Sequence, residues 1–371
     1  MKKFWQTNKS TFIFISVLFI VWRVFLLLPE FFGRFIVQHP GYNGPIPWAN
    51  TDGIHYLHIA TNGSDFYEQA FFPLFPLLIR YISQVLHLNV LSASLVLVYT
   101  SLFIGLFLFA KLASLDISKS AIKWALIFFL FFPTGFFFVS VYTESLFLLL
   151  CFASFYAMRK KQFFIASVFA GLASATRVAG IFLLPAIVIE YFLGKKRKFT
   201  IQSFLSAIGL SIISSSGLLM YMHYLFLKYK DPLLFFHVQP GFGAQRSGSS
   251  FILLPQVLVR YAKILLTIPY TNHDFWVALL ELSTFSLCII LLVIFYKKVR
   301  FSYLVFSLLA ILVPTLTGTL SSEPRYVLAG FPVFIILGNI KSFSKKVVTL
   351  ILFILLLIIS TLFFLRGYFI A

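Results

Sequence analysis

Long apolar runs separated by short polar or basic stretches make up most of this 371-residue chain. Many of these runs approach the length of about twenty residues that an α-helix needs to cross the hydrocarbon core of a bilayer. They lack the regular alternation of apolar and polar residues that marks the strands of an outer-membrane barrel. Because backbone polar groups in lipid must be paired within their own segment, the pattern predicts an all-α, multi-pass membrane protein with a single domain over residues 1–371.

Composition and charge support a membrane protein. Hydrophobic residues make up 60% of the chain and charged residues only 11%, so a water-soluble globule would expose too much apolar surface. The net charge of +19 arises from short clusters of Lys and Arg between the apolar runs. Clusters in these positions set topology and attract anionic lipid, which argues against nucleic acid as a partner. Cys151 and Cys288 lie in apolar runs and indicate nothing about redox compartment.

Basic clusters stay preferentially on the cytoplasmic side, and this rule sets the predicted orientation. The N-terminal lysines place that end inside, and the first run has no small-residue cleavage site, so we expect an uncleaved first span. Further inside clusters occur at 159–161, 195–198, 297–300 and 341–346. We predict about eleven crossings, with the C-terminus outside. After the first span they are 90–110, 122–141, 143–158, two within 162–193, 203–227, 276–296, 301–320, 326–340 and 347–365.

Two apolar runs do not fit a single crossing. The basic clusters determine on which side of the membrane each apolar run begins and ends, and they place both ends of 71–86 outside. We therefore expect a helix lying in the outer interface, with a short span as the alternative. The run 162–193 has basic residues on both sides but is too long for one pass. Two short crossings that meet near 176–180 would solve this and would bring Arg177 to the outer face.

The topology leaves two long extracytoplasmic loops, 30–89 and 228–275. Most acidic residues map to this side: Glu30, Asp52, Asp65, Glu68, Glu144, Asp231, Asp274 and Glu323. Their crowding indicates an extracytoplasmic polar site, although solvation of two long loops would give the same distribution. The second loop contains an amphipathic stretch, 251–268, which could be a lid, an acceptor platform or a segment resting on lipid headgroups.

The first loop contains a predicted helix over 52–61 with an unusual set of polar side chains. One face of it would carry Asp52, His55, Tyr56 and Ile59. Asn50 or Thr51 could cap this helix. Asp52 would then lie in the first turn, where the helix dipole favours the ionised form that a general base requires. The alternative is that Asp52 only stabilises the start of the helix.

The spacing His55-x-x-His58 could also form half of a metal site, completed by Asp52, Asp65 or His39, although loop histidines are more often hydrogen-bonding groups. The chain has no phosphate-cradling glycine loop and no nucleophile elbow, which excludes most nucleotide-dependent and serine-hydrolase chemistry.

Arginines at membrane depth are costly unless they face a polar partner or a cavity, which singles out Arg23, Arg177 and Arg325. Arg325 could clamp a phosphate, but it could equally extend to the membrane surface or pair with Glu323. Glu144 begins a predicted span, where it either caps the helix or lines the same cavity as these arginines.

Five motifs, in order between residues 48 and 330, resemble the PIG-V-type mannosyltransferases of the GT-C membrane glycosyltransferase superfamily. They are Asp52-Gly-Ile-His-Tyr-Leu-His-Ile-Ala, Ala70-Phe-Phe-Pro-Leu-Phe-Pro, Tyr142-Thr-Glu-Ser-Leu-Phe-Leu-Leu-Leu, Ala175-Thr-Arg-Val-Ala-Gly-Ile and Pro324-Arg-Tyr. The family usually has Trp immediately before the Asp, whereas this chain has Thr51 there and Trp48 three residues earlier.

The resemblance implies a GT-C-like helical bundle in which the first outer loop carries the catalytic acid and interfacial helices. It implies a polyprenyl- or dolichyl-phosphate-linked sugar as donor. Eukaryotic relatives add the second mannose to the glycosylphosphatidylinositol precursor, and prokaryotic relatives act on other lipid-linked or surface acceptors.

We therefore predict an inverting hexosyltransferase, most plausibly for mannose, in a prokaryotic cytoplasmic membrane or, if eukaryotic, in the endoplasmic reticulum. Asp52 is the predicted general base. The predicted substrate-binding residues are His55, Tyr56, Glu68, Glu144, Arg177, Arg325 and Tyr326. The partners are the lipid-linked donor, a glycolipid or lipid-linked glycan acceptor, and membrane lipids. A lipid phosphate already leaves readily, so a divalent metal would help but is not required. The rival hypotheses are a flippase of a lipid-linked sugar and an inactive membrane scaffold.

Overall fold

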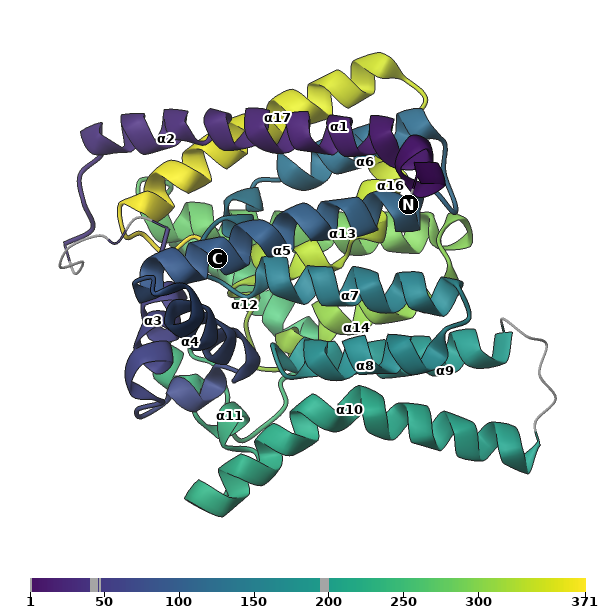
Figure 1. The fold of residues 1–371 in the computed structure, drawn as a ribbon. Coiled ribbons are helices and arrows are strands. Elements are labelled where there is room, and N and C mark those ends of the chain that lie inside the picture. The colour runs from purple at the N-terminus through teal and green to yellow at the C-terminus, as the bar shows by residue number, and fades with distance from the viewer. Residues whose placement is uncertain (1, 41–45, 47, 194–199) are drawn as a thin grey trace.

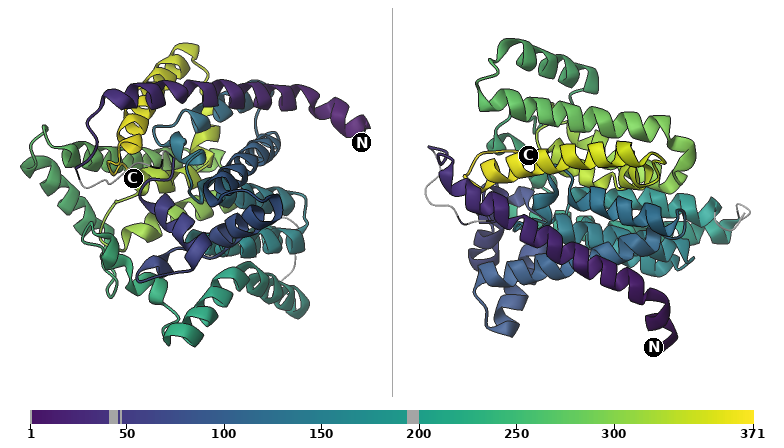
Figure 2. Two further views of the ribbon diagram at one scale, coloured as in Figure 1. Left: turned by 60° about the vertical axis from the view of Figure 1, so that its left-hand side comes forward. Right: turned by 90° about the horizontal axis from the view of Figure 1, so that it is seen from above.

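A computed structural model describes residues 2–40, 46, 48–193 and 200–371. Within these ranges the chain forms helices and no strand, as predicted. Most of the long helices run roughly along one direction and form a bundle (Figure 1). The N-terminal helix runs along the outside of this bundle, and its first turns project beyond the neighbouring helices (Figure 2). The basic cluster 195–198, predicted to be cytoplasmic, lies outside the described residues.

Within the described ranges, five helical segments are long and apolar enough to cross a bilayer. The first is Lys9–Phe35, which runs from α1 (Lys2–Phe25) through α2 (Leu27–Phe32) and η1 (Gly33–Phe35). The others are α5 (Val90–Ala113), α10 (Ile201–Tyr229), α13 (His273–Ile294) and α17 (Phe343–Leu365). Other apolar helices are shorter: α4 (Leu74–Leu86), α7 (Glu144–Arg159), α8 (Phe163–Ser174), α9 (Leu183–Leu193) and α14 (Phe301–Thr315). The all-α, multi-pass character is confirmed, whereas the number of crossings and the orientation stay predictions.

Two predicted crossings, 122–141 and 326–340, are not continuous helices. α6 (Lys119–Leu130) ends three residues before Pro133, and α16 (Pro332–Gly338) follows the short turns α15 (Glu323–Tyr326) and η7 (Val327–Ala329). Proline has no backbone N–H and restricts the residue before it, which interrupts a helix. α6 and α16 pack against each other, and residues 131–148 are all buried. Protein therefore shields the irregular backbone here.

The run 162–193 folds back on itself, as predicted. α8 ends at Ser174, the turn η4 (Val178–Phe182) follows, and α9 returns beside α8. A Cβ on Gly180 would lie 2.2 Å from the backbone nitrogen of Ser174, so this tight turn requires glycine. Arg177 lies in the same turn and reaches a cavity that it shares with Asp52.

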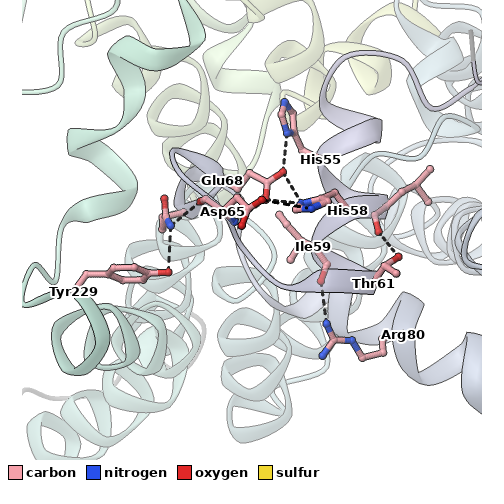
Figure 3. Close-up of polar contacts among 10 residues, drawn as sticks. His55, His58, Ile59, Thr61, Asp65, Glu68, Arg80 and Tyr229 are labelled. Atoms are coloured by element: carbon pink, nitrogen blue, oxygen red, sulfur yellow. Dashed lines mark hydrogen bonds and ion pairs between the residues drawn. The ribbon is translucent and has the colours of Figure 1, made fainter. Parts of the chain in front are cut away.

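The first long loop contributes α3 (Asp52–Asn62) and α4, which gather with α11 (Leu234–His237) at one end of the bundle (Figure 1). The thirteen residues of α4 are too few to cross a bilayer, which favours an interfacial helix over a short span. Arg80 of α4 donates to the carbonyls of Ala60 at 2.7 Å and Ile59 at 3.0 Å, so it satisfies the C-terminal end of α3 (Figure 3). This contact fixes α3 against α4.

The second long loop continues from α11 into η5 (Gln239–Phe242) and α12 (Leu254–Thr267). The amphipathic stretch 251–268 contains α12, whose buried residues are Val257 and Tyr261. α12 packs against α13. Tyr261 donates a hydrogen bond to Glu281, a buried acid of α13. The loop is therefore anchored on the bundle.

Candidate active site

Asp52 is the first residue of α3, as predicted, but the predicted capping is wrong. α3 has no side-chain N-cap hydrogen bond, and Thr51 stands at the N-cap position with φ of 51°. The Thr51 hydroxyl contacts that of Tyr142, and the Asn50 amide donates to the carbonyl of Phe364 at 2.6 Å. Tertiary partners therefore take the place of a local cap. A positive φ at a β-branched residue is rare, and such conformations cluster at functional sites.

Asp52 belongs to a chain of four alternating charges. Arg325 Nη1 lies 2.6 Å from Asp52 Oδ2, and Arg325 Nε lies 3.3 Å from Glu144 Oε1. Arg177 Nη1 lies 2.5 Å from the same Oε1. The side chains of Glu144 and Arg325 are only 2% and 8% exposed. Each buried charge is therefore compensated by an opposite one, which offsets the cost of its desolvation.

Arg325 neither extends to the membrane surface nor pairs with Glu323, so both alternatives to a role in the site are wrong. Its guanidinium is buried rather than extended toward the membrane surface. Its carboxylate partners are Asp52 and Glu144, not Glu323, whose fully buried carboxylate accepts no hydrogen bond from the described residues. The ion pairs therefore place Arg325 beside the catalytic candidate.

Tyr326 links the two arginines of this chain. Its ring lies 5.0 Å from the Arg177 guanidinium carbon and 5.5 Å from that of Arg325. Arg325 also lies 5.2 Å from the ring of Tyr142. Arginines over aromatic faces gain cation–π attraction and lose freedom to move. These rings therefore hold the guanidinium groups in place.

The electrostatic surroundings keep Asp52 ionised. Burial alone would raise the pKa of this carboxyl, but the charge and hydrogen bond of Arg325, with smaller contributions from Arg246 and His55, hold the pKa of Asp52 below its usual value. The side chain is 27% exposed and lines the cavity. Asp52 is thus a carboxylate at neutral pH, which is the form that accepts a proton.

Glu68 lies between the two histidines of α3 (Figure 3). Its Oε1 is 2.9 Å from His55 Nδ1 and its Oε2 is 2.9 Å from His58 Nδ1, and Oε2 also accepts the backbone N–H of Asp65 at 2.9 Å. Burial raises the pKa of Glu68, but these hydrogen bonds outweigh it and hold the pKa below its usual value. Glu68 therefore ties the loop after α3 to that helix and orients His55.

The residues considered for a metal site engage other partners. His58 Nε2 lies 3.6 Å from Asp65, while His39 packs edge-on against Tyr368. Over residues 2–40, 46, 48–193 and 200–371, no group of three or more His, Cys, Asp or Glu side chains is arranged to hold a metal ion. The two α3 histidines instead share Glu68.

A cavity of about 650 Å³ collects most of the predicted site residues. Those that line it are Asp52, His55, Tyr56, Glu144, Arg177, Arg325 and Tyr326. Glu68 contacts the cavity only through His55. Much of the remaining wall is apolar and comes from Phe71, Phe147, Phe235, Phe242, Val313 and Leu328. The site thus combines a charged region with an extended apolar surface, which suits a molecule with a polar head and a hydrocarbon tail.

A family model described as mannosyltransferase (PIG-V) matches residues 43–231, just over half of the chain. The chain belongs to the PIG-V mannosyltransferase family. The match includes Asp52, Glu68, Glu144 and Arg177 and ends before Arg325. The predicted family is therefore confirmed.

This PIG-V family member is also similar to individual proteins. It is 30% identical to GPI mannosyltransferase 2 of Drosophila pseudoobscura pseudoobscura over 35% of this chain and 33% of that protein. Its fold is similar to that of ArnT from Cupriavidus metallidurans bound to undecaprenyl phosphate, with a TM-score of 0.52, 13% identity, and coverage of 92% of this chain and 62% of that chain. The chain thus spans a third of the curated relative and under two thirds of ArnT. The likeness to ArnT confirms the predicted GT-C-like fold.

Arg246 of this PIG-V family member is a cavity residue that was not among the predicted site residues. This residue lies in the second long loop and lines the cavity beside Gln239 and Phe242. Its position in a predicted outer loop, just after the stretch Gln239-Pro240-Gly241-Phe242-Gly243, was the available signal.

Trp48 does not line the cavity of the PIG-V fold. Its buried ring lies 5.1 Å from the guanidinium carbon of Arg23, which also donates to the Tyr99 hydroxyl at 3.0 Å. Trp48 therefore attaches the first loop to α1 and α5, and Arg23 serves this packing rather than the site.

Proposed function

We propose that this protein is an inverting mannosyltransferase that uses a polyprenyl-phosphate-linked donor and a hydroxyl of a lipid-linked or surface glycan as acceptor. The observation that carries the proposal is that Asp52, paired with Arg325, lines one cavity together with Arg177, Arg246 and an apolar wall. Family membership and the relative named GPI mannosyltransferase 2 support the sugar. The fold shared with ArnT, whose structure holds undecaprenyl phosphate, supports the lipid carrier.

The proposed transfer is a single displacement. The acceptor oxygen attacks the anomeric carbon of the sugar while its proton passes to Asp52. The bond between that carbon and the phosphate oxygen breaks, and its electron pair stays on the departing lipid phosphate. Asp52 Oδ2 is held by Arg325, so we assign the proton to Oδ1. General-base assistance of this kind accelerates a reaction by about two to four orders of magnitude.

The surrounding residues would orient the reactants. Arg325 and Arg177 supply fixed positive charge near the phosphate, where negative charge grows as the bond breaks. His55, Tyr56, Glu144 and Tyr326 line the cavity and are proposed to contact sugar hydroxyls. Glu68 acts through His55 and is a positioning residue. A lipid phosphate is already a competent leaving group, so a divalent metal would assist the transfer without being required.

We propose that the reaction takes place on the extracytoplasmic face, where the loops 30–89 and 228–275 meet over the cavity. Membership in this membrane family and the apolar helices support a multi-pass protein. A prokaryotic cytoplasmic membrane stays the predicted location. The apolar wall would hold the first isoprenoid units of the donor and keep water from the sugar.

The proposal is tested by incubating the purified full chain, in liposomes, with radiolabelled polyprenyl-phosphate mannose and membrane lipids. A transferase produces a new labelled glycolipid. Movement of label between leaflets without a new product would instead support a flippase. The absence of both a new product and label movement would support an inactive scaffold. Only the first outcome agrees with the proposal.

A further inference from the structure

The charged residues that line the cavity are not balanced. They are Asp52, Glu144, Arg177, Arg246 and Arg325, which leaves a net charge of +1. Both carboxylates are already occupied, because Arg325 pairs with Asp52 and with Glu144, and Arg177 pairs with Glu144. The uncompensated charge therefore falls on Arg246.

Arg246 has only neutral partners. Its Nη2 donates to the hydroxyls of Ser321 and Ser322 at 3.3 Å each, and its Nη1 donates to Gln239 Oε1 at 3.3 Å. In the described part of the chain, no carboxylate forms an ion pair with it. The side chain is half-buried. A guanidinium prefers charged, bidentate acceptors, and three long bonds to neutral oxygens leave that capacity unused.

The surroundings fix Arg246 next to the reaction centre. Ser321 and Ser322 immediately precede the short helix that carries Arg325. In the loop that holds Arg246, the ring of Phe242 lies 5.5 Å from that of Phe71 and 6.3 Å from that of His55. The loop is thus docked on both sides of the cavity, and its arginine contributes to the field at Asp52.

We propose that Arg246 is the main ligand of the donor phosphate, with the hydroxyls of Ser321 and Ser322 beside it. This inference rests on the proposed function and adds a direct phosphate ligand to it: Arg246 binds the phosphate oxygens, while Arg325 and Arg177, which are held by carboxylates, act on the phosphate only through their charge. A sugar phosphodiester carries one negative charge, which matches the net charge of the cavity. As the sugar leaves, the phosphate gains a second charge, and the unpaired Arg246 accommodates it. Arg325 meanwhile keeps Asp52 ionised and in place.

The test measures lipid phosphate binding separately from transfer. The full chain in phosphatidylcholine nanodiscs is titrated with polyprenyl phosphate, as wild type, Arg246→Gln and Arg246→Lys. We expect Arg246→Gln to weaken binding by about 10- to 100-fold, since hydrogen bonds to charged groups contribute about 1.5–3 kcal/mol. Arg246→Lys keeps the charge but loses the fork geometry, so it should recover part of the affinity.

Arg260→Gln is the matched control. Arg260 belongs to the same loop and also has neutral partners, the carbonyls of Gly318 and Ala244 and the side chain of Gln245, but it does not line the cavity. Its variant should bind polyprenyl phosphate within about threefold of wild type. An equal loss in both glutamine variants would show a structural effect of the loop and would overturn the proposal.

Two further arms identify the anion. Inorganic phosphate, and nanodiscs made with phosphatidylglycerol, should compete weakly with polyprenyl phosphate in the wild type. Equal competition by phosphatidylglycerol would make Arg246 a general lipid contact and contradict the proposal. In transfer assays, Arg246→Gln should raise the donor KM as well as lower kcat. A wild type that binds through Arg246 but makes no glycolipid would refute the proposed function alone. Unchanged binding by Arg246→Gln in an active enzyme would refute this inference alone.

Discussion

Replacing Arg325 by Gln should change the pH at which the enzyme loses activity. The pKa of Asp52 lies below its usual value because Arg325 outweighs burial. The active carboxylate is therefore lost only when the pH falls through that lowered pKa. Without Arg325, burial remains and raises the pKa. The acidic limb of kcat/KM should then move to higher pH in Arg325→Gln.

The size of this shift follows from the geometry. Arg325 Nη1 lies 2.6 Å from Asp52 Oδ2. Two unit charges in such an ion pair, about 4 Å apart, attract by about 1 kcal/mol in water-like surroundings and by about 4 kcal/mol at an effective dielectric constant of about 20. Asp52 is 27% exposed, so its surroundings lie between these limits. An interaction of this size is large enough to displace the acidic limb measurably toward higher pH when Arg325 is removed.

The assay measures initial rates of transfer between pH 3 and pH 8 for wild type, Arg325→Gln and the control Arg260→Gln. Rates are compared after normalisation, so a lower overall rate in Arg325→Gln does not obscure the position of the limb. The control should follow the wild-type profile. An acidic limb at the same pH in wild type and Arg325→Gln would refute the claim that Arg325 sets the protonation of Asp52.

Two further changes test the supports of the site. Glu144→Gln should lower the free energy of unfolding by about 3 kcal/mol, because it leaves the buried Arg325 and the half-buried Arg177 without their shared carboxylate. The double variant Glu144→Gln/Arg177→Gln should recover part of this loss in thermal unfolding. A Glu144→Gln protein as stable as wild type would contradict the network. Arg80→Gln removes both hydrogen bonds to the end of α3 and should lower the free energy of unfolding by about 1–3 kcal/mol. It should lower kcat with little effect on polyprenyl phosphate binding. An unchanged kcat would show that the position of α3 does not depend on α4.

The sequence predicts the helical architecture and much of the site because these depend on local rules. The length of each apolar run identifies the membrane helices. The basic residues on both sides of 162–193 predict that the chain turns back within this run. The motif around Asp52 places an acid at the start of a helix. Six of the seven predicted substrate-binding residues line one cavity, and Glu68 supports it through His55.

The predictions that were wrong or incomplete concern features that tertiary contacts determine. Pro133 follows the end of α6 and Pro332 begins α16, so two segments that hydropathy treats as continuous are interrupted. The buried surroundings tolerate the irregular backbone. Thr51 and Asn50 bind distant groups instead of capping α3. Arg246 follows no periodic pattern, and its importance depends on which carboxylates are already paired. No spacing rule contains that information.

The central claim, that Asp52 is the general base, is tested most directly by the transfer rate of purified Asp52→Asn with a polyprenyl-phosphate mannose donor. Asparagine keeps the shape but cannot accept the proton, so kcat should fall by about 100- to 10,000-fold while membrane expression is preserved. Asp65→Asn, at a side chain that is 79% exposed in the same loop, is the matched control and should stay near the wild-type rate. Wild-type turnover by Asp52→Asn would contradict the account.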